Sequence, residues 1–269
     1  MEVLYGLHPV EEAIRSGSRS LDHVLVARDR RDERLERVIT QCRLANVRVS
    51  TESREQLTRM AKTDMHQGVL AVVRERRLLG IEDLLAIKKP VEADGTAAGH
   101  RFFLALDGVE DPHNLGALLR TADAVGVDGV VLPERRSAPL NATVAKTSAG
   151  ASEHVRIAKV TNLVRSLEQM KQQNIWVLGL DERGTPDYMD FDFRTDCVLV
   201  LGREGAGLHD LVKKTCDHLL RIPMAGAVSS LNVSVAGAVV MYEAMRQRRS
   251  LPDPKPQSTK SKVRKGLGS

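Results

Sequence analysis

The residues from Ile222 to Arg248 combine a segment rich in Gly, Ala and Ser with an apolar helix of small residues that follows it directly. Such an opening leaves backbone amides and carbonyls accessible, and the helix behind it holds them in place. This arrangement suits the binding of a flat, polar cofactor by main-chain atoms. A plain loop before a buried helix shows the same pattern, so this stretch alone favours the simpler interpretation.

A second stretch, LDGVEDPHNLGALLRTADAVGVDGV from Leu106 to Val130, predicts a helix with Asp111 as its N-cap and Pro112 at its first position. One stripe of this helix contains His113, Gly116, Ala117 and Arg120. An arginine beside a small-residue groove suits a phosphate or a ribose edge, although a lone helical arginine more often forms a surface ion pair. Asn114 lies about 120° from Arg120 around the helix, so spacing alone does not bring the two together.

A third stretch, LVLGREGAGL from Leu199 to Leu208, ends an apolar strand in a loop that holds Glu204 among three glycines. A carboxylate on such a loop is more often structural or solvated than catalytic. Gly202 at the end of the strand would let a cofactor approach the backbone closely. The first strand of this half of the chain, by contrast, is followed by DGVEDPHN and not by GxGxxG, which argues against an ordinary dinucleotide-binding fold.

In their order and position, the three stretches resemble the motifs of the SpoU (TrmH) family of RNA ribose methyltransferases, which belong to the SPOUT class. YGLHPVEEAI near the N-terminus and HQGVLAVV at His66–Val73 extend the resemblance to the subgroup with an N-terminal substrate-binding domain. It covers nearly the whole chain except the linker and the tail. The resemblance implies S-adenosylmethionine (SAM) as methyl donor, no metal, and 2'-O-methylation of a guanosine ribose in the peptidyl-transferase P loop of 23S rRNA.

The resemblance also assigns roles to individual residues. It implies a catalytic set of Asn114, Arg120, Glu204 and Asn232. It places Gly202, Ile222 and Leu231 around the adenosyl group, and we add Gly179, Gly205, Met224 and Ser230 from their positions in the same loops or at strand ends. Family members are proposed to use Arg120 for phosphate binding and for deprotonation of the hydroxyl. Because an arginine keeps its proton above pH 12, placing and polarising the nucleotide is the better role for it.

Four segments follow from composition and periodicity. Residues 1–75 predict a small α/β domain, which by resemblance binds the RNA substrate; residues 76–100 predict a linker with one short helix. In residues 101–248 apolar runs alternate with helices, which predicts an α/β domain with a mostly parallel sheet flanked by helices. The trefoil knot of a SPOUT domain is implied by the resemblance only. Residues 249–269, rich in Pro, Ser and Lys, predict a disordered basic tail.

Net charge alone gives little support for RNA binding. The formal charge is +5, but seven Lys or Arg and one Asp lie from Arg248 onward, which leaves the rest nearly neutral. RNA contacts must therefore come from local patches or from the tail. The arginines at 28–37 are interleaved with acidic residues, which fits a solvated helix face or an RNA-contacting patch. The tail fits a solubilising segment or an RNA-binding arm.

The remaining expectations concern location and partners. Three isolated cysteines without a CxxC pair predict reduced thiols and no metal, and the lack of a signal sequence or membrane-length apolar run predicts a cytoplasmic protein with no membrane partner. The helix predicted at Val233–Met245 is apolar around most of its circumference; it is a core helix or, as the resemblance implies, part of a homodimer interface in the C-terminal domain.

Two alternatives to the implied function stay open: the same chemistry on tRNA or another rRNA site, and a non-catalytic RNA-binding assembly factor. The acidic stretch Asp181–Asp196 has no predicted role.

Overall fold

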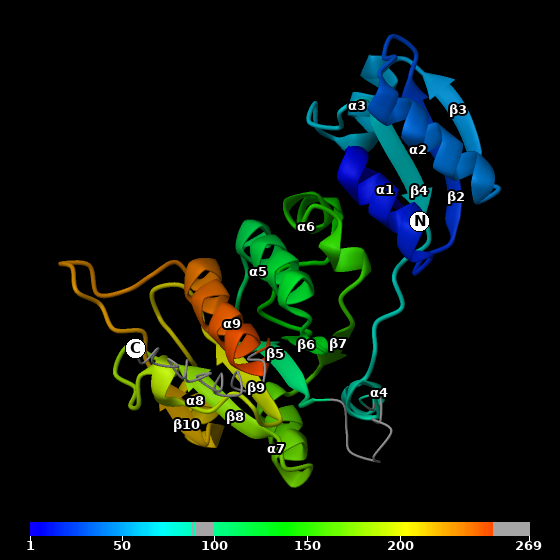
Figure 1. Cartoon of the computed structure of the whole chain (residues 1–269). Helices are drawn as coiled ribbons and strands as arrows, with labels where there is room; N and C mark the ends of the chain where they lie inside the picture. The colour runs from blue at the N-terminus through cyan, green and yellow to red at the C-terminus, as the bar shows by residue number, and fades with distance from the viewer. Residues whose placement is uncertain (88, 90–98, 250–269) are drawn as a thin grey trace, which may run out of the picture.

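The computed structural model describes residues 1–87, 89 and 99–249, and these form two α/β units joined by a short connection (Figure 1). The predicted tail, apart from Arg249, lies outside the described residues, as does most of the second half of the predicted linker. Within the described ranges no helix is both long and apolar enough to cross a membrane.

The N-terminal unit is a four-stranded sheet with three helices. Its strands are β1 (Glu2–Tyr5), β2 (Leu21–Ala27), β3 (Arg48–Glu52) and β4 (Val69–Val73), in the order β1-β4-β2-β3. Its helices are α1 (Leu7–Ser16), α2 (Glu33–Leu44) and α3 (Arg54–Ala61). Asp32 caps α2 and Ser53 caps α3 by accepting hydrogen bonds from backbone amides of the first turn. The sequence did not predict β1, which pairs antiparallel with the fully buried β4.

The C-terminal unit is a six-stranded sheet in which all neighbouring strands are parallel, as predicted. The strands are β5 (Phe102–Leu106), β6 (Gly129–Pro133), β7 (Ile157–Val160), β8 (Trp176–Leu180), β9 (Cys197–Leu201) and β10 (His218–Leu220), in the order β10-β8-β9-β5-β6-β7. The helices are α4 (Ile81–Leu85), α5 (Pro112–Val125), α6 (Ala142–Thr147), α7 (Leu163–Gln172), α8 (Asp210–Thr215) and α9 (Val233–Arg249), with 3-10 turns η1 (Ala151–Glu153) and η2 (Tyr188–Asp190).

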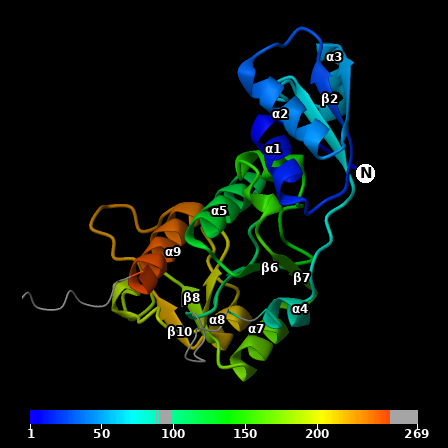
Figure 2. The ribbon, with the colours of Figure 1, turned by 45° about the vertical axis from the view of Figure 1, so that its right-hand side comes forward.

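Helices cover both faces of this sheet, which explains why polar and apolar residues do not alternate along its central strands. Successive residues of β5 point to opposite faces: Phe102 and Leu104 pack in the cluster with α5 and α9, and Phe103 packs in the cluster with α4, α7 and α8. The two layers are visible on either side of the sheet (Figure 2). The short helix predicted within the linker is α4, and it packs against the second face through Ile81, Leu84 and Leu85.

Besides the unpredicted β1, the structure shifts the bounds of two predicted elements and gives a role to a stretch that had none. The run HVRIA at His154–Ala158 predicts a strand, but the strand β7 begins only at Ile157, because the turn after η1 occupies residues 154 and 155. Helix α9 continues beyond Met245 to Arg249. The acidic stretch Asp181–Asp196 crosses the sheet edge beside β10, and its Phe193 is fully buried in the core. This stretch therefore has a structural role at the sheet edge.

Candidate active site

Three polar side chains from distant segments meet in one hydrogen-bonded cluster. Asn114 Nδ2 donates to Glu204 Oε2 at 3.1 Å. Asn232 Nδ2 donates to Glu204 Oε1 at 2.9 Å and to Asn114 Oδ1 at 3.0 Å. The carboxylate therefore accepts one hydrogen bond on each oxygen, and the two amides are linked to each other. Three of the four residues in the predicted catalytic set are brought together.

Helix α5 fixes Asn114 in its first turn. Asp111 accepts hydrogen bonds from the backbone amides of His113 at 3.0 Å and Asn114 at 3.4 Å, and Pro112 begins the helix. Asn114 is only 6% exposed. Because a polar group this buried requires a partner, its bond to Glu204 satisfies the amide as well as orienting it.

Asn232 begins helix α9 and joins the cluster at the same time. Its Oδ1 accepts from the backbone amide of Ser234 at 2.9 Å and from the Ser234 hydroxyl at 2.6 Å. Because these donors occupy the amide oxygen, the Asn232 NH2 group must face Glu204 and Asn114. The cap of α9 thus orients a side chain of the candidate site.

The loop after β9 that carries Glu204 is held by close contacts within its own backbone. Arg203 and Gly207 exchange two hydrogen bonds of 3.0 and 2.9 Å. A Cβ on Gly202 would lie 2.2 Å from the carbonyl carbon of Gly207, so no side chain fits at this position. Gly205 and Gly207 have φ of 73° and 66°, which is the left-handed region that glycine adopts without strain.

A buried Asp–His pair anchors the far end of this loop. Asp107, which is 6% exposed and directly follows β5, accepts from the His209 backbone amide at 2.7 Å and lies 2.8 Å from His209 Nδ1. Arg136 Nη1 approaches His209 Nε2 at 3.3 Å, and since arginine only donates, Nε2 accepts and Nδ1 carries the hydrogen. Sequence reasoning missed this pair; its only sequence signal is an aspartate between an apolar strand and a glycine.

Arg120 does not join the cluster. It lies exposed on α5, and among the described residues it has no hydrogen bond or ion pair. Its guanidinium is therefore available to a ligand, but no protein contact fixes its position.

The predicted cofactor residues lie at one edge of the sheet. Gly179, Gly202 and Ile222 are near the carboxyl ends of β8, β9 and β10, which are parallel neighbours. A Cβ on Gly179 would meet Cys216 Sγ at 2.7 Å, so this glycine is needed for packing. The other predicted residues, Gly205, Met224, Ser230 and Leu231, are exposed on the two loops.

The loop between β10 and α9 has unpaired main chain. It extends from the body of the domain (Figure 1), and none of its backbone groups from residue 224 to 231 makes a hydrogen bond with another described residue. Met224 and Leu231 are 39% and 38% exposed. Free amides and carbonyls beside apolar side chains fit the polar edge and the flat face of an adenine ring. Among the described residues no three His, Cys, Asp or Glu form a group suited to a metal ion.

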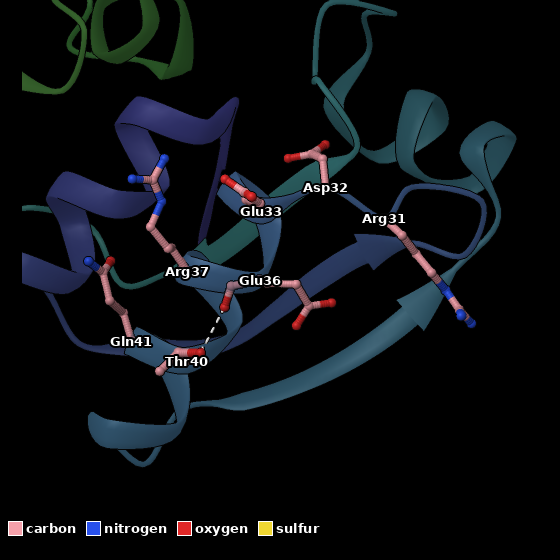
Figure 3. A pocket seen from close by; sticks show the side chains of 7 residues that line it. All are labelled: Arg31, Asp32, Glu33, Glu36, Arg37, Thr40 and Gln41. Carbon is pink, nitrogen blue, oxygen red and sulfur yellow. Dashed lines mark hydrogen bonds between the residues drawn. The ribbon is translucent and has the colours of Figure 1, made fainter.

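A shallow hollow on α2 contains part of the arginine cluster (Figure 3). Arg31 and Arg37 extend in different directions from it, and neither forms an ion pair with another described residue. Arg34 instead lies 3.5 Å from Glu11, and Arg30 is paired with Asp32. Arg30 and Arg34 are therefore neutralised within the domain, as on a solvated helix face, whereas Arg31 and Arg37 are free to contact an anion.

Comparisons with known proteins agree with this geometry. The model described as "SpoU rRNA Methylase family" matches residues 101–242, and the model "RNA 2'-O ribose methyltransferase substrate binding" matches residues 3–79. The 23S rRNA (guanosine-2'-O-)-methyltransferase RlmB of Bordetella pertussis is 42% identical over 249 residues, which are 92% of this chain and 98% of the relative. The protein of the same name from Yersinia pestis is 40% identical over 247 residues, with coverages of 92% and 98%.

Solved structures show the same architecture. The SpoU methyltransferase AviRb from Streptomyces viridochromogenes, in complex with AdoMet, superposes with a TM-score of 0.75 at 25% identity and covers 91% of this chain and 90% of its own. An AdoMet-bound rRNA methyltransferase from Sinorhizobium meliloti gives 0.73 at 25% identity, with coverages of 93% and 88%. The resemblance seen in the sequence motifs is confirmed over both units: the chain belongs to the SpoU rRNA methylase family and carries the family's substrate-binding domain at its N-terminus.

Proposed function

We propose that this protein transfers the methyl group of SAM to the 2'-hydroxyl of a guanosine in the P loop of 23S rRNA. The observation that carries the proposal is the cluster in which Asn232 donates to Glu204 at 2.9 Å and to Asn114 at 3.0 Å. A purely RNA-binding module has no need of this hydrogen-bonded cluster, in which Asn114 is buried and Glu204 and Asn232 are exposed, beside a loop of unpaired main chain. Relatives named 23S rRNA (guanosine-2'-O-)-methyltransferase align with 92% of the chain.

In the proposed reaction, SAM supplies an electrophilic methyl group, and the protein holds and orients the ribose hydroxyl. The loop of residues 222–231 and the strand ends at Gly179 and Gly202 hold the adenosyl group through main-chain atoms. Glu204 fixes the amides of Asn114 and Asn232, so that they face the ligand without reorganising during the reaction. Arg120 binds the phosphate next to the target ribose and polarises the hydroxyl.

A homodimer formed through the C-terminal domain is part of the proposal. Val235 and Tyr242 of α9 are 49% and 48% exposed and lie seven residues apart, which places them on one helix face. Leu231, in the loop directly before α9, is also 38% exposed. Light scattering after removal of RNA should give the mass of two chains, and the mass of a monomer would contradict the proposed dimer.

We further propose that residues 1–75 and 101–248 act as substrate-binding and methyltransferase domains with residues 76–100 as the connection, and that the protein works in the cytoplasm on rRNA. The trefoil knot remains an expectation from the family resemblance.

The decisive experiment follows a radiolabelled methyl group from SAM into protein-free 23S rRNA taken from cells that lack this modification. The product is mapped by the resistance of a 2'-O-methylated linkage to alkaline cleavage. One resistant position at a P-loop guanosine is the expected result. Incorporation into tRNA or another rRNA site alone would keep the chemistry and overturn the substrate. Tight RNA binding without incorporation into either would favour an assembly factor.

A further inference from the structure

The segment of α6 and η1 in the methyltransferase domain forms a seat for the N-terminal domain. Ala145 is buried in the hydrophobic cluster of the N-terminal domain, together with Leu4 and Val10. Lys146 Nζ donates to the carbonyl oxygen of Met65 at 2.6 Å and lies 5.3 Å from the centroid of the Tyr5 ring. Helix α1 lies directly against this seat (Figure 2).

A buried ion pair lies at the centre of the contact. Arg19 Nε donates to Glu153 Oε2 at 2.8 Å and Arg19 Nη2 donates to Glu153 Oε1 at 3.1 Å. The two side chains are 3% and 0% exposed, and Arg19 Nη1 also donates to Glu2 of the N-terminal domain. Such a bidentate pair has a fixed geometry, and both charged groups are removed from water when the contact forms. Separating the domains would break both hydrogen bonds and expose Arg19 and Glu153 to water, and reseating the domain would require the two side chains to be dehydrated and aligned again.

The backbone at Gly150 permits the close approach of the two domains. Its φ is 87°, and a Cβ at this position would lie 2.7 Å from the Cβ of Glu12 and 3.1 Å from the carbonyl oxygen of His8. Beside it, Glu12 Oε2 lies 2.7 Å from His154 Nε2. Arg76, in the connection between the domains, donates to the carbonyl of Val155. The seat is thus specific in shape and in charge.

The other side of the seat contacts the helix that carries Asn114. Thr147 Oγ1 donates to the Pro112 carbonyl at 3.2 Å, and a Cβ on Gly116 would lie 1.8 Å from that same hydroxyl oxygen. A single short segment therefore lies between the substrate-binding domain and α5. Any change in how the N-terminal domain is seated alters the position of an RNA bound to that domain relative to the catalytic cluster.

We propose that Arg19 and Glu153 are positioning residues for RNA methylation: their ion pair holds the substrate-binding domain on the α6 seat of its own chain. This rests on the proposed function. Two RNA-contacting surfaces that are already aligned bind one RNA without an ordering cost, and the gain is lost when they move independently. Arg19→Met leaves the fully buried Glu153 carboxylate without its cation, which lowers the ratio of seated to unseated domain by about 100-fold or more. Glu153→Gln removes the ion pair between the domains but leaves Arg19 paired with Glu2, so its effect is smaller.

The test uses the full chain with Arg19→Met, Glu153→Gln, and the double variant Arg19→Met/Glu153→Leu. The double variant replaces the two buried charges by apolar groups of similar size, a change that is often neutral for buried pairs, and the Glu2 carboxylate that remains is 31% exposed and in contact with water. Glu153→Gln keeps the shape of the side chain if the methionine variant fails to fold. Arg194→Met is the matched control, because Arg194 pairs with Asp192 in an exposed position away from the seat.

Interdomain distance is measured by electron paramagnetic resonance between spin labels at Leu44→Cys and Leu211→Cys, which are 82% and 68% exposed in the native chain. Burial raises the pKa of the Cys42 thiol to about 11 and those of Cys197 and Cys216 to about 12, so labelling favours the introduced thiols. Excess unlabelled chain suppresses distances between subunits.

A narrow distance distribution is expected for the parent, the control and the double variant, and a broad one for each single variant. The KM for 23S rRNA should rise about tenfold in Arg19→Met and by less in Glu153→Gln, and it should return to the parent value in the double variant, while kcat and SAM affinity stay unchanged.

A narrow distribution with unchanged KM in the single variants would overturn the proposal. So would a fall in KM, which would mean that the seated state is inhibitory, or a parallel loss of kcat and SAM binding, which would mean a general folding role. If the parent methylates no RNA, the proposed function fails, but the distance distributions and the dissociation constant for rRNA still decide whether the pair positions the domain.

Discussion

Asn114 and Glu204 are 90 residues apart in the chain and are joined by a hydrogen bond of 3.1 Å from Nδ2 to Oε2. Each belongs to a segment that follows a central strand of the parallel sheet, so the sheet brings the two segments to the same edge. The carboxylate also accepts a hydrogen bond from Asn232. Within the cluster, Glu204 therefore only accepts hydrogen bonds, whereas each asparagine donates at least one. This gives Glu204 a defined task that can be tested.

Replacing Glu204 by glutamine should lower the rate of methyl transfer about 10- to 100-fold, because one of the two amide donors would then face another NH2 group. SAM affinity should change by less than about threefold, since the loop backbone is unaltered. Single-turnover methylation and calorimetric titration with SAM measure the two effects. Glu110→Gln, an exposed carboxylate before α5, is the matched control and should retain the parent rate.

Replacing Arg120 by alanine should reduce methyl transfer by at least about 100-fold while SAM binding stays nearly unchanged. The side chain is exposed and contacts no other described group, so its loss costs little folding stability. Arg165→Ala on the exposed side of α7 is the control. Loss of SAM binding together with activity would assign Arg120 a structural role instead.

Gly202→Ala should destabilise the loop that carries Glu204, because the new Cβ would lie 2.2 Å from the carbonyl carbon of Gly207. We expect a loss of about 1–3 kcal/mol in the free energy of unfolding, together with weaker SAM binding. Gly226→Ala is the comparison, since a Cβ there meets nothing within 4 Å. Denaturant unfolding with equal losses in the two variants would contradict the steric explanation.

Arg248 near the end of α9 holds the starts of two central strands. Its guanidinium donates to the carbonyls of Phe193 at 2.9 Å, His100 at 2.8 Å and Thr195 at 2.7 Å, and it lies 4.8 Å from the centroid of the Phe102 ring. Arg248→Ala should therefore lower the free energy of unfolding by about 2–4 kcal/mol. The adjacent Arg249→Ala, at an exposed position, should change it by less than about 0.5 kcal/mol.

Deletion of residues 250–269 tests the charge of the tail beyond Arg249; these residues lie outside the described part of the chain and contain five Lys or Arg and one Asp. If the tail contacts RNA, its removal should weaken RNA binding and reduce the dependence of the binding constant on salt concentration. Filter binding at several salt concentrations measures both. An unchanged affinity and slope would leave the tail a solubilising role.

Much of the fold could be predicted from local patterns. The fully apolar runs Phe102–Leu106 and Cys197–Leu201 indicated a sheet covered on both faces, and Asp111-Pro112 correctly marked the start of α5. The short strand Glu2–Tyr5 was missed because four residues with a half-buried first pair carry too little pattern. The boundary of β7 was wrong because Val155 is buried in the turn between η1 and β7 without belonging to a strand.

The candidate site was less accessible to local reasoning. On one helix, spacing separates Asn114 from Arg120, and only the family motif connected Asn114 with Glu204 and Asn232. Their contacts span 90 and 118 residues, and no periodicity encodes a pairing at that distance. The Asp107–His209 pair, 102 residues apart, was missed for the same reason. Tertiary structure, not propensity, decides such contacts.

The tight fit at Gly150 and Gly116 sets limits on how this protein can exchange parts with its relatives. Residues 142–153 touch the substrate-binding domain on one side and α5 on the other, and neither contact leaves space for a β-carbon at the glycine involved. A chimera in which the N-terminal domain is replaced by that of a relative must therefore take residues 142–153 from the same relative. The smallest transferable module in this chain is then discontinuous in sequence, with one part at the N-terminus and another inside the catalytic domain.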